Sequence, residues 1–250
     1  MNEKTLTVRS LTPLTKDTCA LVLEGDCGTA QPGQFADLKL PGRFLRRPIS
    51  IWDAAGDHLD LLFKVMGQGT RELAAMTPGS TLDVLLPLGT GFDVADQGTA
   101  PVLAAGGIGM PPIYACAKAM TALGQTPRVV LGFNSKEDIL PLDRFRDLGI
   151  EPVLTTADGS AGQKGFVTDA LKSMEFDYLF CCGPAPMLRA VLPLAPDGQF
   201  SLEERMGCGF GACMGCSIET PDGPRRVCKD GPVFRKADLA LWAGGKEAAR

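Results

Sequence analysis

Four cysteines near the C-terminus restrict what this chain can fold into more than any other feature. Cys208, Cys213, Cys216 and Cys228 are spaced C-x4-C-x2-C-x11-C, with glycines at positions 207, 209, 211 and 215. This is the spacing of plant-type [2Fe–2S] ligation, and glycines let a loop wrap a cluster and donate N–H groups to its sulfurs. Structural zinc is the main alternative, although its usual paired C-x2-C knuckles are missing. The pattern predicts a C-terminal segment held by metal.

The bulk properties narrow the class of protein. The N-terminal sequence MNEKTLTVRS is charged and alternating, which favours a first strand over a signal peptide. The cytoplasm is therefore the expected location, and there the nine cysteines stay reduced, which argues against disulfides. A net charge of -4 without any basic block argues against a nucleic-acid partner. No apolar run is long enough for a membrane span.

Residues 1–97 are expected to form an antiparallel β domain. Six short β-rich runs are separated by turn residues: TLTVRSL, CALVLEG, FADLKL, RPISIWD, HLDLLFKV and TLDVLLPLG. One helical stretch, TRELAAM, interrupts them and starts at Thr70, which is placed to cap it. Six strands with one short helix favour a closed barrel.

The pattern changes near residue 98. Residues 98–200 alternate buried strands, such as APVLAAGG and YLFCCG, with helical segments such as PPIYACAKAMTALG. This alternation is typical of a parallel sheet with crossover helices. Residues 201–250 show little periodicity and need a metal site or docking to be held in place. The expected fold class is a β barrel, then an α/β domain, then a metal-holding C-terminal segment.

Two turns of the α/β domain are candidates for nucleotide binding. Gly106, Gly107 and Gly109 lie between a strand and a helix N-terminus, where backbone N–H groups receive phosphate, although a tight turn explains them equally well. The sequence CCGPAPML follows the last strand, and ligands of open α/β sheets bind beyond the carboxyl ends of strands. Strand alternation points Cys182 into this crevice and Cys181 into the core.

The barrel carries two further candidate motifs. In RRPIS, Arg47 is suited to clamp a pyrophosphate and Ser50 to bind a heterocycle. GQGT, residues 67–70, begins a helix and is a second candidate phosphate-binding site. Taken singly, a surface arginine and an ordinary helix start explain both motifs. Glu203 and Glu204 border the cysteine-rich segment, either as a solvated pair or as a contact to a cofactor.

The combined motifs resemble the ferredoxin–NADP reductase superfamily along the whole chain. Within it, the C-terminal EERMGCGFGACMGCSIET…RVCKDGPVF is similar to the electron-transfer subunits of type B dihydroorotate dehydrogenases. RRPIS, GQGT, AGGIGMPP and CGPAPM match that family as well. Ile49 stands where the superfamily usually has tyrosine before the serine, as in this subfamily.

The resemblance implies three cofactors and their positions. A [2Fe–2S] cluster would bind the four cysteines, so residues 201–250 would be an iron–sulfur segment. FAD would bind in the barrel at Arg47, Pro48, Ile49, Ser50, Leu62, Phe63, Lys64, Gly69 and Thr70. NAD would bind the α/β domain at Gly106, Gly107, Gly109, Met110, Pro111, Gly183, Pro184 and Met187. Cys182 would lie beside the stacked flavin and nicotinamide, and Cys182 and Glu204 are the candidate catalytic residues. Acidic residues in NSKED and TTADGS favour NAD over NADP. Lys136, a positive charge in the first of these segments, argues in the opposite direction.

The resemblance also implies a partner. An FMN-containing TIM-barrel subunit would oxidise dihydroorotate in pyrimidine biosynthesis, and electrons would pass through the cluster and FAD to NAD+. The expected assembly is a heterotetramer with two chains of each kind. Two alternatives stay open: a ferredoxin- or sulfide-linked NAD(P)H oxidoreductase subunit, and a regulatory module with structural zinc.

Overall fold

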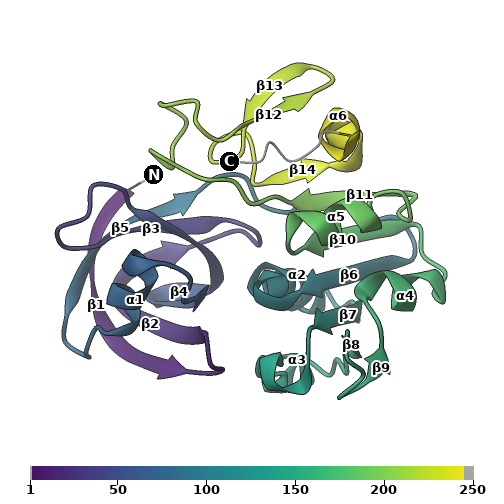
Figure 1. Cartoon of the computed structure of the whole chain (residues 1–250), viewed down its shortest axis with the longest axis horizontal. Coiled ribbons are helices and arrows are strands. Elements are labelled where there is room, and N and C mark those ends of the chain that lie inside the picture. Colours follow the sequence, from purple (N-terminus) through teal and green to yellow (C-terminus); the bar gives the residue numbers. More distant parts are fainter. Residues whose placement is uncertain (1, 245–250) are drawn as a thin grey trace.

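The computed structural model describes residues 2–244, which form a barrel, an α/β domain and a segment that lies across both (Figure 1). Five antiparallel strands close the barrel in the order β1-β2-β4-β3-β5. Their bounds are β1 (Asn2–Pro13), β2 (Thr18–Thr29), β3 (Phe35–Lys39), β4 (Arg47–Lys64) and β5 (Thr81–Leu88), with helix α1 (Gln68–Ala74) between β4 and β5. Leu21, Leu59 and Val84 are among the fully buried side chains that fill it.

The barrel has five strands where the sequence pattern predicts six. The runs RPISIWD and HLDLLFKV are one strand, β4, whose first part pairs with β3 and whose second part pairs with β2. Residues 54–57 between them are mostly exposed and include no large apolar side chain, so they break the hydropathy pattern. Ala55 and Gly56 nevertheless stay paired with Thr29 and Gly28 of β2, because backbone pairing does not depend on side-chain hydropathy.

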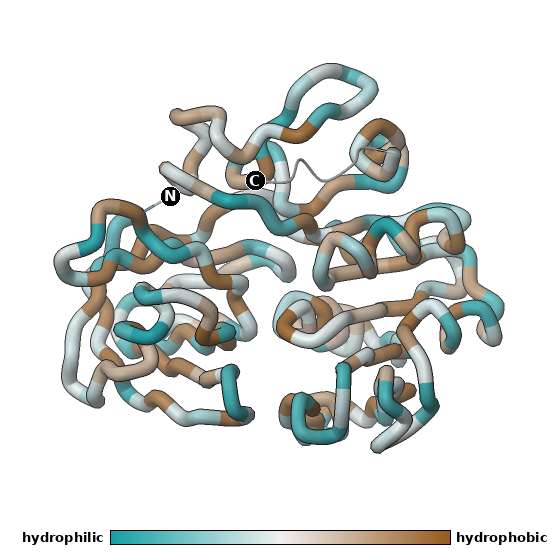
Figure 2. The backbone as a smooth tube through the Cα atoms, viewed as in Figure 1, coloured by the Kyte–Doolittle hydropathy of each residue, from teal (hydrophilic) through white to brown (hydrophobic). Residues whose placement is uncertain are grey.

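The α/β domain is built on a seven-stranded sheet with the order β14-β11-β10-β6-β7-β8-β9. Its parallel strands are β6 (Pro101–Gly106), β7 (Arg128–Phe133), β8 (Val153–Thr156), β9 (Gln163–Lys164), β10 (Tyr178–Cys182) and β11 (Asp197–Ser201). Two helices cover one face, α2 (Met110–Ala122) and α3 (Asp143–Asp147), and two cover the other, α4 (Val167–Lys172) and α5 (Ala185–Val191). In Figure 2 the strands of both halves carry most of the hydrophobic colour and the outer turns are mostly hydrophilic.

The last segment is part of the sheet and is more regular than its sequence pattern predicts. Strand β14 (Val233–Arg235) joins the sheet edge antiparallel to β11. Before it, β12 (Ser217–Thr220) and β13 (Gly223–Arg226) form a hairpin, and η3 (Lys236–Leu239) and α6 (Ala240–Gly244) follow. The hairpin and its flanking loops lie above both halves in Figure 1. Among residues 2–244, no helix has the length and hydropathy needed to cross a membrane.

Ion pairs and aromatic rings join the barrel to the α/β domain. The Arg144 guanidinium of α3 lies 3.8 Å from the ring centroid of Trp52 in β4 and forms an ion pair with the buried Asp60. Lys118 of α2 forms a second ion pair, 2.5 Å long, with Asp53 of β4. The Trp52 ring meets the Tyr114 ring edge-on, with centroids 6.1 Å apart. These contacts set how the two halves face each other.

Candidate functional site

A cavity of about 370 Å³ opens where the barrel, the α/β domain and the C-terminal segment meet. The barrel side of this cavity is formed by both ends of β4 and the start of α1. All nine residues expected to contact a flavin nucleotide line it: Arg47, Pro48, Ile49, Ser50, Leu62, Phe63, Lys64, Gly69 and Thr70. The long strand β4 brings Arg47 and Lys64 to one cavity although they are 17 positions apart, because it bends around the closed barrel.

The close approach of Arg47 to α1 depends on a glycine. An ideal Cβ placed on Gly69 would lie 2.3 Å from Arg47 Nε, so a larger residue would displace the guanidinium. Arg47 Nη1 donates to the carbonyl oxygens of Leu45 and Arg46, at 2.8 and 3.0 Å. The guanidinium and the first turn of α1 therefore face the same part of the cavity, an arrangement suited to a phosphate.

Thr70 lies one turn further along the helix than the sequence predicts. Gly67 is the N-cap of α1, and Thr70 is its third residue. The Thr70 hydroxyl accepts hydrogen bonds from the N–H groups of Met66 and Gly67, at 2.9 and 3.0 Å. Thr70 thus stabilises the helix start from inside, and it still lines the cavity.

Two glycine turns of the α/β domain pack against each other beside the cavity. A Cβ on Gly109 would lie 2.3 Å from the Cys182 carbonyl oxygen, and one on Gly106 would lie 2.4 Å from Met187 Sδ. β6 and β10 are neighbours with Ala105 opposite Cys182, so both turns stand at the carboxyl edge of the sheet. This is the edge where open α/β sheets bind nucleotides.

The other predicted residues of these turns do not line the cavity. Gly107 takes a positive φ of 51° and has open space where a side chain would be. Met110 and Pro111 are buried inside the first turn of α2, so they support the turn from within. Pro184 is the N-cap of α5, and a Cβ on Gly183 would lie 2.8 Å from Met187 Sδ. Of the AGGIGMPP turn, Ile108 lines the cavity.

Cys182 lines the cavity and Cys181 is buried in the core on the opposite face of β10, as strand alternation predicts. Burial and the negative charge of Glu203 raise the pKa of the Cys182 thiol to about 12, against a hydrogen bond from Ser201 that lowers it. The thiol is therefore protonated at neutral pH. Glu203 and Glu204 line the same cavity. Glu203 is exposed toward the cavity, yet desolvation by the protein around it raises the pKa of its carboxyl group.

The structure brings the four predicted ligand cysteines together in two pairs. They lie on the loop of residues 202–216, here called the cysteine loop, and on the turn after β13. The Cys208 and Cys213 side chains interact with each other, as do those of Cys216 and Cys228, and Cys208 is close enough for its charge to act on Cys228. A two-iron cluster takes two thiolates on each iron, which this pairing provides. Within residues 2–244, no three His, Cys, Asp or Glu side chains converge on a single metal ion.

Backbone N–H groups point at the cysteine sulfurs. Ala212 N–H donates to Cys208 Sγ at 3.2 Å, and Cys228 N–H donates to Cys216 Sγ at 3.4 Å. Burial would raise the pKa of Cys208, but donation from the N–H groups of Cys213, Phe210 and Ala212 prevails and lowers it to about 6. Burial and the neighbouring Cys216 instead raise the pKa of Cys228 to about 12. The N–H groups that stabilise the Cys208 thiolate fit an iron–sulfur cluster.

The cysteine loop packs against the barrel through a buried carboxyl group. A Cβ on Gly209 would lie 2.4 Å from Asp37 Oδ2 of β3, and Gly209 has a positive φ of 77°. Burial raises the pKa of Asp37 to about 7, opposed by the charge of Arg46. Cys208, the residue before Gly209, therefore lies close to strand β3 of the barrel.

Several cavity residues escape prediction from the sequence. Ser201 and Leu202 line the cavity at the carboxyl end of β11, together with Phe35, Met206 and Pro232. The segment DGQFS of β11 contains Phe200 as its one large apolar residue, so hydrophobic periodicity had nothing to detect.

Comparisons with known proteins agree with this geometry. Residues 203–240 match the family described as the iron–sulfur cluster binding domain of dihydroorotate dehydrogenase B. Over 257 residues the chain is 40% identical to the dihydroorotate dehydrogenase B (NAD(+)) electron transfer subunit of Geobacillus sp. (strain WCH70), covering 96% of this chain and all of the relative. The subunit of the same name from Fusobacterium nucleatum is 39% identical, covering 94% of this chain and 97% of the relative.

Solved structures share the fold. The structure of an NADH-dependent reduced ferredoxin–NADP oxidoreductase superposes with a TM-score of 0.85 at 28% identity, covering 93% of this chain and 88% of that one. The Amycolatopsis cytochrome P450 reductase GcoB matches the fold with a TM-score of 0.68 at 23% identity, over 77% of this chain and 65% of that one. With the near full-length relatives and the paired cysteines, these findings show that the chain belongs to the family of dihydroorotate dehydrogenase B electron transfer subunits.

Proposed function

We propose that this chain passes electrons from a dihydroorotate-oxidising partner subunit through a [2Fe–2S] cluster and FAD to NAD+. The observation that carries the proposal is the continuity of the cysteine loop with the cavity. Ser201, Leu202, Glu203, Glu204 and Met206 line the cavity, and Cys208 follows two residues later. The cysteines and the flavin cavity are thus adjacent, as electron transfer between their cofactors requires.

The residues present fit all three groups. Paired thiols with N–H donors fit the cluster; Arg47 beside the start of α1 fits the FAD pyrophosphate; and the glycine turns at the carboxyl edge of β6 and β10 fit NAD. When bound, the cluster supplies one-electron transfer and the flavin supplies hydride exchange with the nicotinamide. The chain itself would position these groups next to one another.

We also propose that Cys182 and Glu204 contact the reacting rings in this cavity. Because the Cys182 thiol stays protonated, it would act by packing and by weak S–H donation, not as a nucleophile or a base. Cys182→Ser is expected to slow flavin reduction by NADH about tenfold, equivalent to about 1.4 kcal/mol, without changing the FAD content. Stopped-flow absorbance measures this rate, and an unchanged rate would remove Cys182 from the site.

Gly69 of GQGT provides a test of the flavin site. Gly69→Ala would push a methyl group into the Arg47 guanidinium and is expected to weaken FAD binding about 10- to 100-fold, the value of one charge-assisted phosphate contact. Gly244→Ala is the control, because nothing lies within 4 Å of its added Cβ and Gly244 does not line the cavity. Fluorescence titration of the flavin-depleted chain with FAD measures both affinities. Equal affinities would contradict the placement of the pyrophosphate at Arg47.

The partner is best identified by reconstitution. We propose an FMN-containing TIM-barrel dihydroorotate dehydrogenase subunit, a complex with two chains of each kind, and a cytoplasmic location. Co-expression should yield a complex that contains iron, FAD and FMN and reduces NAD+ with dihydroorotate, and native mass spectrometry would give its stoichiometry. A colourless, flavin-free chain would overturn the proposal.

One alternative has its own support. The structural likeness to the NADH-dependent reduced ferredoxin–NADP oxidoreductase favours a ferredoxin-linked NAD(P)H oxidoreductase subunit. Assay of the purified chain with reduced ferredoxin, and of the co-expressed complex with dihydroorotate, separates the two. Activity with ferredoxin alone would select the alternative.

A further inference from the structure

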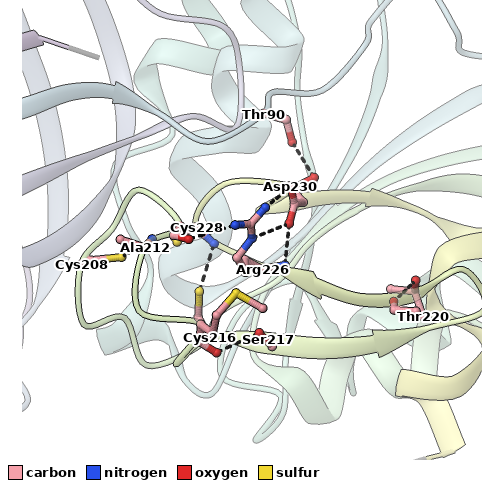
Figure 3. A network of polar contacts seen from close by, with 12 residues as sticks. Thr90, Cys208, Ala212, Cys216, Ser217, Thr220, Arg226, Cys228 and Asp230 are labelled. Carbon is pink, nitrogen blue, oxygen red and sulfur yellow. Dashed lines mark hydrogen bonds and ion pairs between the residues drawn. The ribbon is translucent and has the colours of Figure 1, made fainter.

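Arg226, at the end of β13, connects three parts of the cysteine region (Figure 3). Its Nη1 donates to the Gly211 carbonyl oxygen of the cysteine loop at 2.9 Å. Its Nε and Nη2 donate to the two carboxylate oxygens of Asp230, at 3.0 and 3.3 Å. The Asp230 carboxylate also accepts the Arg226 N–H at 2.8 Å, so the guanidinium is held in one orientation.

The peptide unit that Arg226 contacts is the one that donates to Cys208. The Gly211 carbonyl and the Ala212 N–H belong to the same peptide group, and this N–H lies 3.2 Å from Cys208 Sγ. A cation on the carbonyl oxygen polarises the peptide and strengthens donation from its N–H. Arg226 therefore acts on a sulfur of the cysteine loop through one intervening peptide, from a position 18 residues later in the chain.

Arg226 also carries its charge close to the other pair of cysteines. Its guanidinium interacts electrostatically with Cys228 and Cys216, and its side chain is only 24% exposed. The turn that carries Asp230 is itself held in place. Thr90 N–H donates to the carbonyl oxygen of Gly231, the residue after Asp230, at 2.6 Å. Thr90 follows β5, so the barrel side of the molecule helps to hold Arg226 in place.

From this geometry we infer that Arg226 is a positioning residue that makes the iron–sulfur cluster easier to reduce. It holds the Gly211–Ala212 peptide against Cys208 and places a positive charge beside Cys216 and Cys228. Reduction adds a negative charge to the cluster, and both hydrogen bonds to its sulfurs and a nearby cation stabilise that charge. The inference rests on the proposed function, since it requires that the four cysteines hold a cluster.

The neighbouring Arg225 supplies a matched control. Its guanidinium donates to Asp238 and Asp222, both at 3.2 Å, and within residues 2–244 its side chain makes no hydrogen bond to the cysteine loop. Its side chain is 35% exposed, comparable with Arg226. Arg225→Gln removes the same charge from the same hairpin without touching the Gly211–Ala212 peptide.

The test is a redox titration of the flavin- and iron-loaded chain, followed by the EPR signal of the reduced cluster. Arg226→Gln is expected to shift the midpoint potential to more negative values, and Arg226→Lys to shift it in the same direction by less. Lysine keeps the charge but loses the fork that orients the peptide. Arg225→Gln should leave the potential unchanged. Amide exchange of the 208–214 segment should become about tenfold faster in Arg226→Gln, as expected for the loss of one charge-assisted hydrogen bond.

Several results would overturn the inference. An unchanged potential in Arg226→Gln, or an equal shift in Arg225→Gln, would show that Arg226 has no specific effect. An unshifted Arg226→Lys, or unchanged amide exchange, would reduce its role to charge alone. Loss of iron from both Arg226 variants would also contradict it, because the inference requires that the four thiolates retain the cluster without Arg226. Absence of iron from the parent chain would instead refute the proposed function.

Discussion

Replacing Cys213 by serine is expected to remove the cluster and abolish electron transfer from the partner, while NADH oxidation through FAD continues. Cys213 is the exposed member of the Cys208–Cys213 pair, so its loss leaves one iron with a single thiolate. The flavin cavity is lined by other residues and stays intact. Dihydroorotate-linked NAD+ reduction should fall by more than about 100-fold, beyond the range for outer-shell changes. NADH oxidation by an artificial acceptor should change less than about twofold, since binding near that site is unaltered.

The control for this prediction is another cysteine. Cys27→Ala removes a buried thiol of β2 that lies outside both the cavity and the cysteine loop. Its iron content, measured by chelator assay, should equal that of the parent chain. If Cys213→Ser kept its iron, or lost both activities equally, the division between cluster and flavin would be wrong.

Arg144→Met is expected to cause the largest loss of stability, about 3 kcal/mol, because it leaves the buried Asp60 carboxylate without its partner. The substitution also removes the cation from the face of Trp52. For a chain of this size the loss corresponds to a fall of roughly 6–12 °C in the unfolding temperature. Because Arg144 joins the α/β domain to the barrel, FAD and NAD should also be held less well. Calorimetry of the flavin-loaded chain measures the first effect.

The same helix carries the control. Arg146 forms surface ion pairs with Asp143 and Glu151, and such pairs are worth about 0–1 kcal/mol, so Arg146→Met should change stability little. Adding Asp60→Asn to Arg144→Met should recover part of the loss, because the unpaired buried charge is then gone. Equal effects of Arg144→Met and Arg146→Met would show that the joint between the halves lies elsewhere.

The architecture was predictable where it depends on local pattern. Alternating hydropathy identified the barrel strands, and strand–helix alternation identified the parallel sheet. The prediction failed at β4, which was divided in two at residues 54–57, a mostly exposed stretch without large apolar side chains that stays paired with β2. It also missed β11, whose short segment is buried between β10 and β14 although only Phe200 in it is a large apolar residue. In both cases pairing with neighbouring strands determines the conformation, and the residues of the segment do not show which strands will be its neighbours.

The sequence by itself determined the candidate ligand set and the candidate cofactor motifs. Four cysteines at C-x4-C-x2-C-x11-C can wrap a two-iron cluster whatever the remaining fold, because the spacing fixes the reach of the loop. Only the tertiary structure decided that Gly209 packs on Asp37 of the barrel and that Arg226 contacts the peptide above Cys208. Contacts of this kind join residues far apart in the chain, and their geometry depends on how the barrel, sheet and hairpin pack together. A local pattern holds no information about such packing.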